Sequence, residues 1–142
     1  MNDFMKLTGQ LQIYKNGELV RDIPNLVVTA GKVWLMTLAQ SGSGTPMSHM
    51  AVGTGTTAAA ITDTILETEN ARVALTVAGG TRTNASISFE GVFPAGTGTA
   101  TLTEAGILNA ASTGTLLART VFSAISKGAS DSLTITWTVS LS

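Results

Sequence analysis

The chain has 142 residues, the size of one ordinary domain, and it lacks cysteine, which excludes disulfides and thiolate metal sites. Eight lysines and arginines against nine acidic residues give a net charge of −1, which predicts no electrostatic attraction to nucleic acid. No segment has the pattern of a membrane span or a secretory leader, so we expect a single domain over residues 1–142, made in the cytoplasm.

Charged residues are scarce in this chain: they make up 12% of it, where about 25% is typical. Threonine, serine, glycine and alanine take their place, and the mean hydropathy is +0.32. One interpretation is a plain β-domain with a neutral hydroxyl surface. We favour the other, a subunit largely covered by other chains, because interface cores are depleted in charge and a free monomer relies on charge for solubility.

The first 24 residues predict a β-hairpin. Asn16-Gly17 separates two apolar runs, and both residue types tolerate the positive φ of a type I′ turn. Pro24 is expected to close the hairpin. Because an exposed hairpin can add its edge to another sheet, Asn16 and Gly17 mark a candidate interface arm, packed on this domain or on a neighbouring subunit. The alternative is that the hairpin only completes the protein's own sheet.

A short strand, Leu26 to Val28, is expected to lead into the one early helix. Thr29 is a candidate N-cap. Apolar side chains then recur at helical spacing, which predicts a helix over about Ala30 to Gln40. These apolar residues are Val33, Trp34, Leu35 and Leu38.

The remainder of the chain alternates between apolar runs and turn residues, the spacing expected of an antiparallel β-sandwich. Gly79-Gly80 predicts a second hairpin that joins the strands on either side of it. The predicted strands here are His49–Val52, Ala71–Val77, Ala85–Phe93, Thr99–Asn109 and Thr115–Ile125.

The last stretch, Asp131 to Ser142, has the clearest period-2 pattern in the chain. Serine or threonine alternates with large apolar residues, so one face is expected to be buried against a second layer. The fold class is therefore mainly β, an antiparallel sandwich of about eight or nine strands with one short helix. The predicted core residues of this strand are Leu133, Ile135, Trp137, Val139 and Leu141.

Few residues suggest chemistry. Gly53-Thr-Gly55 lacks the following lysine and long helix of a phosphate loop. Asp63, Glu67 and Glu69 are a candidate cation cluster, although their spacing fits no calcium loop, and a solvated or Arg72-paired cluster is the default. His49 is the only histidine, which we interpret as structural. We expect no catalytic residues, no cofactor and no enzyme activity.

Glu104 and Arg119 stand out because each lies inside an otherwise apolar predicted strand. A buried charge without a partner costs several kcal/mol, so such charges are usually paired. We therefore expect Glu104 and Arg119 to form a structural ion pair with each other across adjacent strands, or with a neighbouring subunit.

Four runs carry a resemblance to a known family. The run from Met50 to Glu69 contains A-V-G-T-G-T-T-A-A-A-I-T-D-T-I-L-E-T-E. The others are T-L-T-E-A-G-I-L-N-A from Thr101, L-L-A-R-T-V-F-S from Leu116, and D-S-L-T-I-T-W-T-V from Asp131. They resemble segments of small virion proteins of tailed bacteriophages, most of all head decoration or cement proteins. The resemblance covers most of Leu26 to Leu141 and leaves out the first hairpin.

The resemblance implies a jelly-roll-like fold that binds the outer face of the assembled phage head and stabilises contacts between capsomers. The implied partners are the major capsid protein of the same phage and other copies of this chain, as a dimer or trimer, with no nucleic acid or membrane. Similar stretches occur in tail-fibre, collar and head-fibre modules that trimerise and contact the host surface, which is the alternative. A carbohydrate-binding sandwich would need exposed aromatics, whereas Trp34 and Trp137 occupy apparent core positions.

Overall fold

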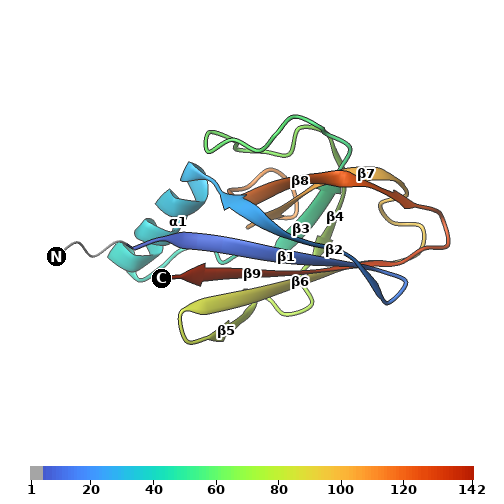
Figure 1. Cartoon of the computed structure of the whole chain (residues 1–142). Helices are drawn as coiled ribbons and strands as arrows, with labels where there is room; N and C mark the ends of the chain where they lie inside the picture. The colour runs from blue at the N-terminus through green and yellow to red at the C-terminus, as the bar shows by residue number, and fades with distance from the viewer. Residues whose placement is uncertain (1–4) are drawn as a thin grey trace.

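The structure, a computed structural model, describes residues 5–142. It is mainly β, with nine antiparallel strands in a curled sheet and one short helix, as the sequence predicted (Figure 1). The elements are β1 (Leu7–Lys15), β2 (Glu18–Val27), α1 (Thr29–Ser41), β3 (His49–Gly53), β4 (Glu69–Ala74), β5 (Thr81–Thr83), β6 (Ser86–Phe93), β7 (Ala100–Leu108), β8 (Leu116–Lys127) and β9 (Leu133–Leu141).

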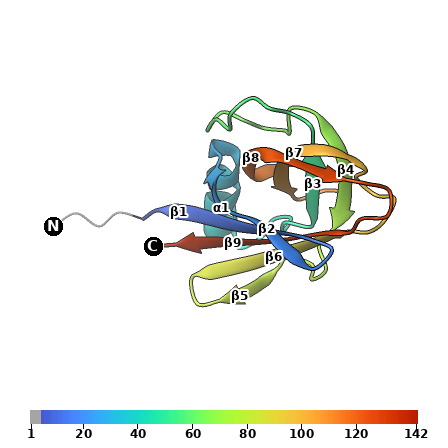
Figure 2. The same cartoon turned by 45° about the vertical axis from the view of Figure 1, so that its right-hand side comes forward.

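The sheet has the strand order β4-β3-β7-β8-β2-β1-β9-β6-β5, and its two parts face each other across the core (Figures 1 and 2). The part formed by β2, β1, β9, β6 and β5 joins the part formed by β8, β7, β3 and β4 only where Leu26 and Val27 pair with β8. On the opposite side, a single bridge between Leu75 and Gly91 brings the end of the β4 segment to β6. One curled sheet therefore supplies both layers of the sandwich.

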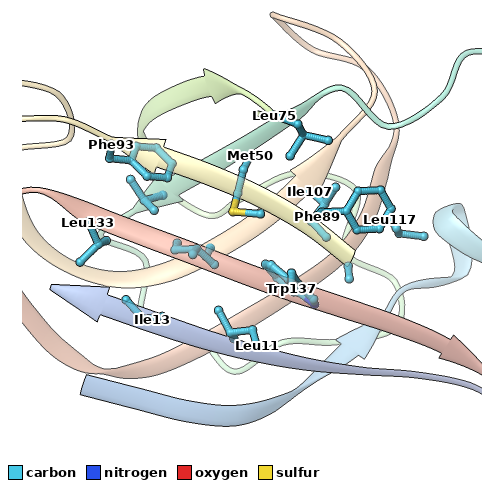
Figure 3. Packing of buried hydrophobic residues seen from close by; sticks show 14 of the residues in the cluster. Leu11, Ile13, Met50, Leu75, Phe89, Phe93, Ile107, Leu117, Leu133 and Trp137 are labelled. Carbon is cyan, nitrogen blue, oxygen red and sulfur yellow. The ribbon is translucent and has the colours of Figure 1, made fainter. Parts of the chain in front are cut away.

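The apolar face of β9 forms the centre of the core, as predicted. Leu133, Ile135 and Trp137 are fully buried, and Val139 is nearly so. Trp137 lies in register between Leu11 of β1 and Phe89 of β6, and Figure 3 shows these side chains directed toward Met50, Ile107 and Leu117 of the facing part. Leu141, the fifth predicted core residue, is only half-buried because β9 ends there at an open end of the sandwich.

The predicted Asn-Gly hairpin is confirmed. Asn16 and Gly17 have φ values of 51° and 83° and connect β1 to β2. However, β1 pairs with β9 along its whole length, from Leu7 opposite Leu141 to Lys15 opposite Leu133, and with β2 on its other side. The hairpin therefore forms part of the protein's own sheet, while β2 pairs with β8 only at Leu26 and Val27, so a role of Asn16 and Gly17 in contact with a neighbouring subunit stays a prediction.

Pro24 does not end the hairpin strand, because β2 continues to Val27. The carbonyl of Pro24 accepts a hydrogen bond from the Thr120 hydroxyl on the β8 side, so the nitrogen of Pro24 also faces that side. There β2 pairs with β8 only at Leu26 and Val27. A proline is tolerated because its missing N–H falls on an unpaired strand edge.

The helix begins one residue earlier than predicted. Val28 occupies the N-cap position without a side-chain hydrogen bond, and Thr29 is the first helical residue, so the prediction of Thr29 as N-cap is wrong. Gly42 ends the helix in the left-handed conformation, and its N–H donates to Leu38. The helix packs lightly: Val33 is 59% exposed, while Trp34 is half-buried.

The predicted second hairpin is also corrected. The β4 strand pairs with β3, and β6 pairs with the short strand β5 through a turn at Asn84, which has a φ of 53°. The strand β5 therefore occupies the edge of β6 where the strand before Gly79-Gly80 was expected to pair. Only the Leu75–Gly91 bridge remains of the predicted pairing.

Replacing Trp137 tests the core. Trp137→Ala should lower the free energy of unfolding by about 3–5 kcal/mol, because it empties the centre of both layers. Thr138→Ala, the neighbouring residue on the opposite face of β9, is the control and should cost much less. Chemical denaturation measures both. A wild-type transition for Trp137→Ala would show that the strand is placed wrongly.

Candidate functional site

Residues 54–68, between β3 and β4, form a long connection that covers the outer face of the β3-β7-β8 part (Figure 1). Leu66 belongs to this connection, and its side chain is buried in a second, small core between the connection and the sheet. Gly106 of β7 leaves room for Leu66, since a Cβ there would lie 2.5 Å from the leucine Cδ1. The other buried members of this small core are Val28, Ala51, Leu108 and Leu116.

Glu104 of β7 is fully buried under this loop. Its Oε2 accepts hydrogen bonds from the backbone N–H groups of Gly55 at 2.7 Å and Thr68 at 2.8 Å. Its Oε1 accepts from the backbone N–H of Glu67 at 2.8 Å. Because the loop has no regular structure, these backbone donors would otherwise have no partner when covered. One carboxylate therefore holds both ends of the loop.

Arg119 of β8, only 2% exposed, completes the network. Its Nε donates to Glu104 Oε1 at 3.0 Å, which confirms the predicted contact between these two residues. Its Nη1 donates to Asp63 at 2.9 Å, and its Nη2 donates to the carbonyl of Thr57 at 3.0 Å. Burial acts to lower the pKa of Arg119, but the hydrogen bonds to Glu104 and Asp63, with their charges, raise it overall. The guanidinium thus fixes the middle of the loop.

The Gly53-Thr-Gly55 segment gains a physical explanation that the sequence did not provide. A Cβ on Gly55 would lie 2.2 Å from Glu104 Oε2, and a Cβ on Gly53 would lie 2.2 Å from the carbonyl oxygen of Thr68. Both positions therefore need glycine for close approach of the backbone. The available signal was a glutamate inside an apolar strand together with two unexplained glycines.

Glu67 caps the turn at residues 56–57. Its carboxylate accepts hydrogen bonds from the Thr57 hydroxyl and from the backbone N–H groups of Thr57 and Thr56, the latter two at 3.1 and 2.8 Å. These donors stabilise the ionised form, the Thr57 hydroxyl most strongly, and so lower the pKa of Glu67.

The candidate cation cluster is not assembled. Asp63 binds Arg119, Glu67 binds the 56–57 turn, and Glu69 binds Arg72 at 2.6 Å. Over residues 5–142, no group of three or more potential metal ligands converges. The loop and β4 direct each carboxylate to a different partner, so the candidate cluster does not form, and Glu69 pairs with Arg72 as the default interpretation expected.

A second polar cluster, which the sequence did not reveal, lies at the other end of the sandwich. The Lys127 ammonium is buried and donates to the carbonyls of Pro94 at 3.0 Å and Asp131 at 2.7 Å. Burial lowers the pKa of Lys127, although the nearby Asp131 charge opposes this effect. The Asp131 carboxylate accepts from the Asn16 amide and from the Gly128 N–H, which lowers its own pKa. These contacts connect the turn at Asn16, the turn that begins at Pro94 and the turn at residues 128–131.

His49 makes a local contact: its Nδ1 lies 2.8 Å from the hydroxyl oxygen of Ser48, its neighbour in the chain. Within residues 5–142, no carboxylate hydrogen-bonds to the His49 ring. This arrangement lacks the third group that orients a catalytic histidine.

Comparison with protein-family models, curated proteins and solved structures finds no match to this chain. Among the described residues, no helix has the length and apolar character needed to cross a membrane. What the structure adds is spatial convergence. Three runs far apart in the chain, which begin at Met50, Thr101 and Leu116, contribute Gly55, Glu104 and Arg119 to one network.

The Glu104–Arg119 contact can be tested by a double-mutant cycle. Glu104→Gln should cost about 3–5 kcal/mol, because it leaves Arg119 and at least one backbone N–H without a suitable acceptor. Combining it with Arg119→Met should show coupling of about 0.5–3 kcal/mol. Glu90→Gln, at an exposed position of β6, is the control. Additive effects of the two single changes would show that the residues do not interact.

The hydrogen bonds to Glu67 predict a pH-dependent effect. Since the folded pKa of Glu67 lies below its ordinary value, its contribution is complete above about pH 4.3 and is lost as the pH falls through the lowered value. Thr57→Val should therefore lower the melting temperature at pH 7, with a deficit that shrinks in acid. Thr56→Val, whose side chain lies outside these contacts, is the control. A deficit independent of pH would contradict the assignment.

Proposed function

We propose that this protein is a structural virion protein that binds the outside of the assembled phage head as a homo-oligomer and stabilises contacts between capsomers. One observation supports it most: large apolar side chains lie exposed on a surface with few charges. Such surfaces on a folded chain usually mark contacts with other chains. The exposed large apolar residues are Met5, Leu19, Val33, Met36, Ile61, Ile65, Val77 and Val92.

Several of these residues lie on two neighbouring segments. Ile61 and Ile65, 54% and 64% exposed, belong to the loop over residues 54–68, and Val33 and Met36 belong to α1. The backbone N–H of Thr29, at the start of α1, donates to the carbonyl of Ile61 at 2.9 Å, so the loop and the helix adjoin. The proposed contact surface is centred on this pair of segments.

The buried network supports a binding role for the loop. An irregular loop normally moves, and ordering it on contact with a partner would weaken binding. Here Glu104 and Arg119 hold the loop before any partner arrives, so Ile61 and Ile65 are presented in a fixed arrangement. This is preorganisation for contact rather than a reaction centre.

Attachment of many copies explains how such a surface could strengthen a shell. A contact of about 1,200–2,000 Å² is enough for specific attachment. A subunit that touches two capsomers converts separate contacts into linked ones, and the gain then comes from multivalency. No single tight bond is needed.

The proposal predicts saturable binding to shells. Purified protein mixed with heads that lack it, from the phage that encodes this chain, should sediment with them at a constant copy number and raise their disruption temperature. Ile65→Glu should reduce occupancy, because it places a charge on the proposed contact surface. Ala129→Glu, in the turn between β8 and β9, is the control. Absence of binding by the folded wild-type protein would reject the shell role.

A further inference from the structure

A groove of about 580 Å³ opens at the end of the sandwich where β1 begins and β9 ends. Its walls come from the start of β1, the end of β2 and one side of α1, where Leu35 and Met36 contribute apolar surface. Met36 is 64% exposed, and Met5, at the rim, is 78% exposed. Flexible thioether side chains of this kind are common on surfaces that bind apolar segments of other chains.

The charge of the groove has one sign. Among residues 5–142, Lys6 and Lys32 line it, and no aspartate or glutamate does. Over the described part of the chain, neither lysine takes part in a salt bridge. An occupant that brings a carboxylate would therefore be favoured. A symmetric contact between two copies of α1 would instead place Lys32 against Lys32.

Asn25 distinguishes between kinds of anionic occupant. It lines the groove, and its amide oxygen and nitrogen are shielded from water with no hydrogen-bond partner in residues 5–142. The side chain lies over the bare backbone of Gly9, where a Cβ would be 1.8 Å from the Asn25 Oδ1. Pairing with an occupant therefore requires this side chain to turn away from Gly9 toward the groove. A peptide unit offers a donor and an acceptor to such an amide, whereas a carboxylate offers acceptors only.

An apolar cavity of about 180 Å³ adjoins the groove and shares Leu7, Leu35 and Leu141 with it. Trp34 forms part of its wall, and Arg82 is the one charged residue among the described residues that line it. A cavity of about 150 Å³ can hold a benzene ring, so this one has room for a large apolar side chain. The groove and the cavity together are suited to a peptide segment that has one large apolar side chain and a carboxylate close to it.

We infer that this groove binds an extended segment of another polypeptide, one that carries large apolar side chains and at least one carboxylate. The peptide backbone pairs with the Asn25 amide, an apolar side chain enters the cavity beside Trp34, and the carboxylate lies near Lys6 and Lys32. The inference does not rest on the proposed shell role, because it requires only a peptide of this chemistry, although Met36 belongs to both surfaces.

Selection from a display library of random linear peptides tests the inference. The wild-type chain should enrich peptides that combine apolar and acidic residues. Lys32→Glu should weaken the selected peptides about tenfold and, in a fresh selection, should enrich basic residues instead. Ser43→Glu, at an exposed position in the loop after α1, is the control and should change neither result. No enrichment, or the same enrichment with Lys32→Glu, would overturn the inference.

Asn25→Leu separates binding from folding. It removes a buried amide without partners, so the melting temperature should stay equal or rise while affinity for a selected peptide falls about tenfold. In the wild type, the Asn25 side-chain NH₂ resonances should shift on peptide addition. Unchanged affinity with Asn25→Leu would overturn the inference, as would dodecanoate that displaces the peptide and binds equally well to Asn25→Leu. Binding that appears only after deletion of residues 1–4 would assign the groove to the chain's own terminus.

Discussion

The outer surface of this molecule depends on the buried carboxylate of Glu104. A loop without regular structure has backbone N–H groups that need hydrogen-bond acceptors, and three of these groups donate to this single side chain. Arg119 balances the charge and reaches on to Asp63 and Thr57. Buried ion pairs often add little net stability, so the main result of this one is the fixed position of the loop.

The constraint extends to residues that carry no charge. Gly53 and Gly55 allow the backbone to approach the carboxylate, and Gly106 admits Leu66 beneath the loop. The sheet therefore has a covered outer face on one part and a hydroxyl-rich outer face on the other. The loop is central to the proposed role because this arrangement holds the exposed side chains of Ile61 and Ile65 in place.

Two regions are suited to contact with other chains, for different reasons. The loop and the adjoining side of α1 present apolar side chains held by internal bonds, which suits a broad contact between folded surfaces. The groove at the start of β1 is concave and positively charged, with an amide that lacks partners, which suits a single extended segment. Both lie near α1, most of whose side chains are exposed or only half-buried. The far end, around Lys127 and Asp131, is instead closed by its own polar contacts.

The sequence by itself determined the local features. The alternation from Leu133 to Val139 was enough to predict a strand with one buried face. Asn16-Gly17 predicted the turn of the first hairpin, and the positions of Glu104 and Arg119 inside apolar strands predicted an ion pair. Only the tertiary structure decided which distant segments contact one another. Gly55 and Glu104 are 49 residues apart, and Thr68 and Glu104 are 36 apart, so no local pattern could reveal their contact. The neighbour of β4, the place of Pro24 within β2 and the partners of Asp63 and Glu67 were likewise decided by which strands meet, because burial and hydrogen bonding depend on the whole fold rather than on adjacent residues.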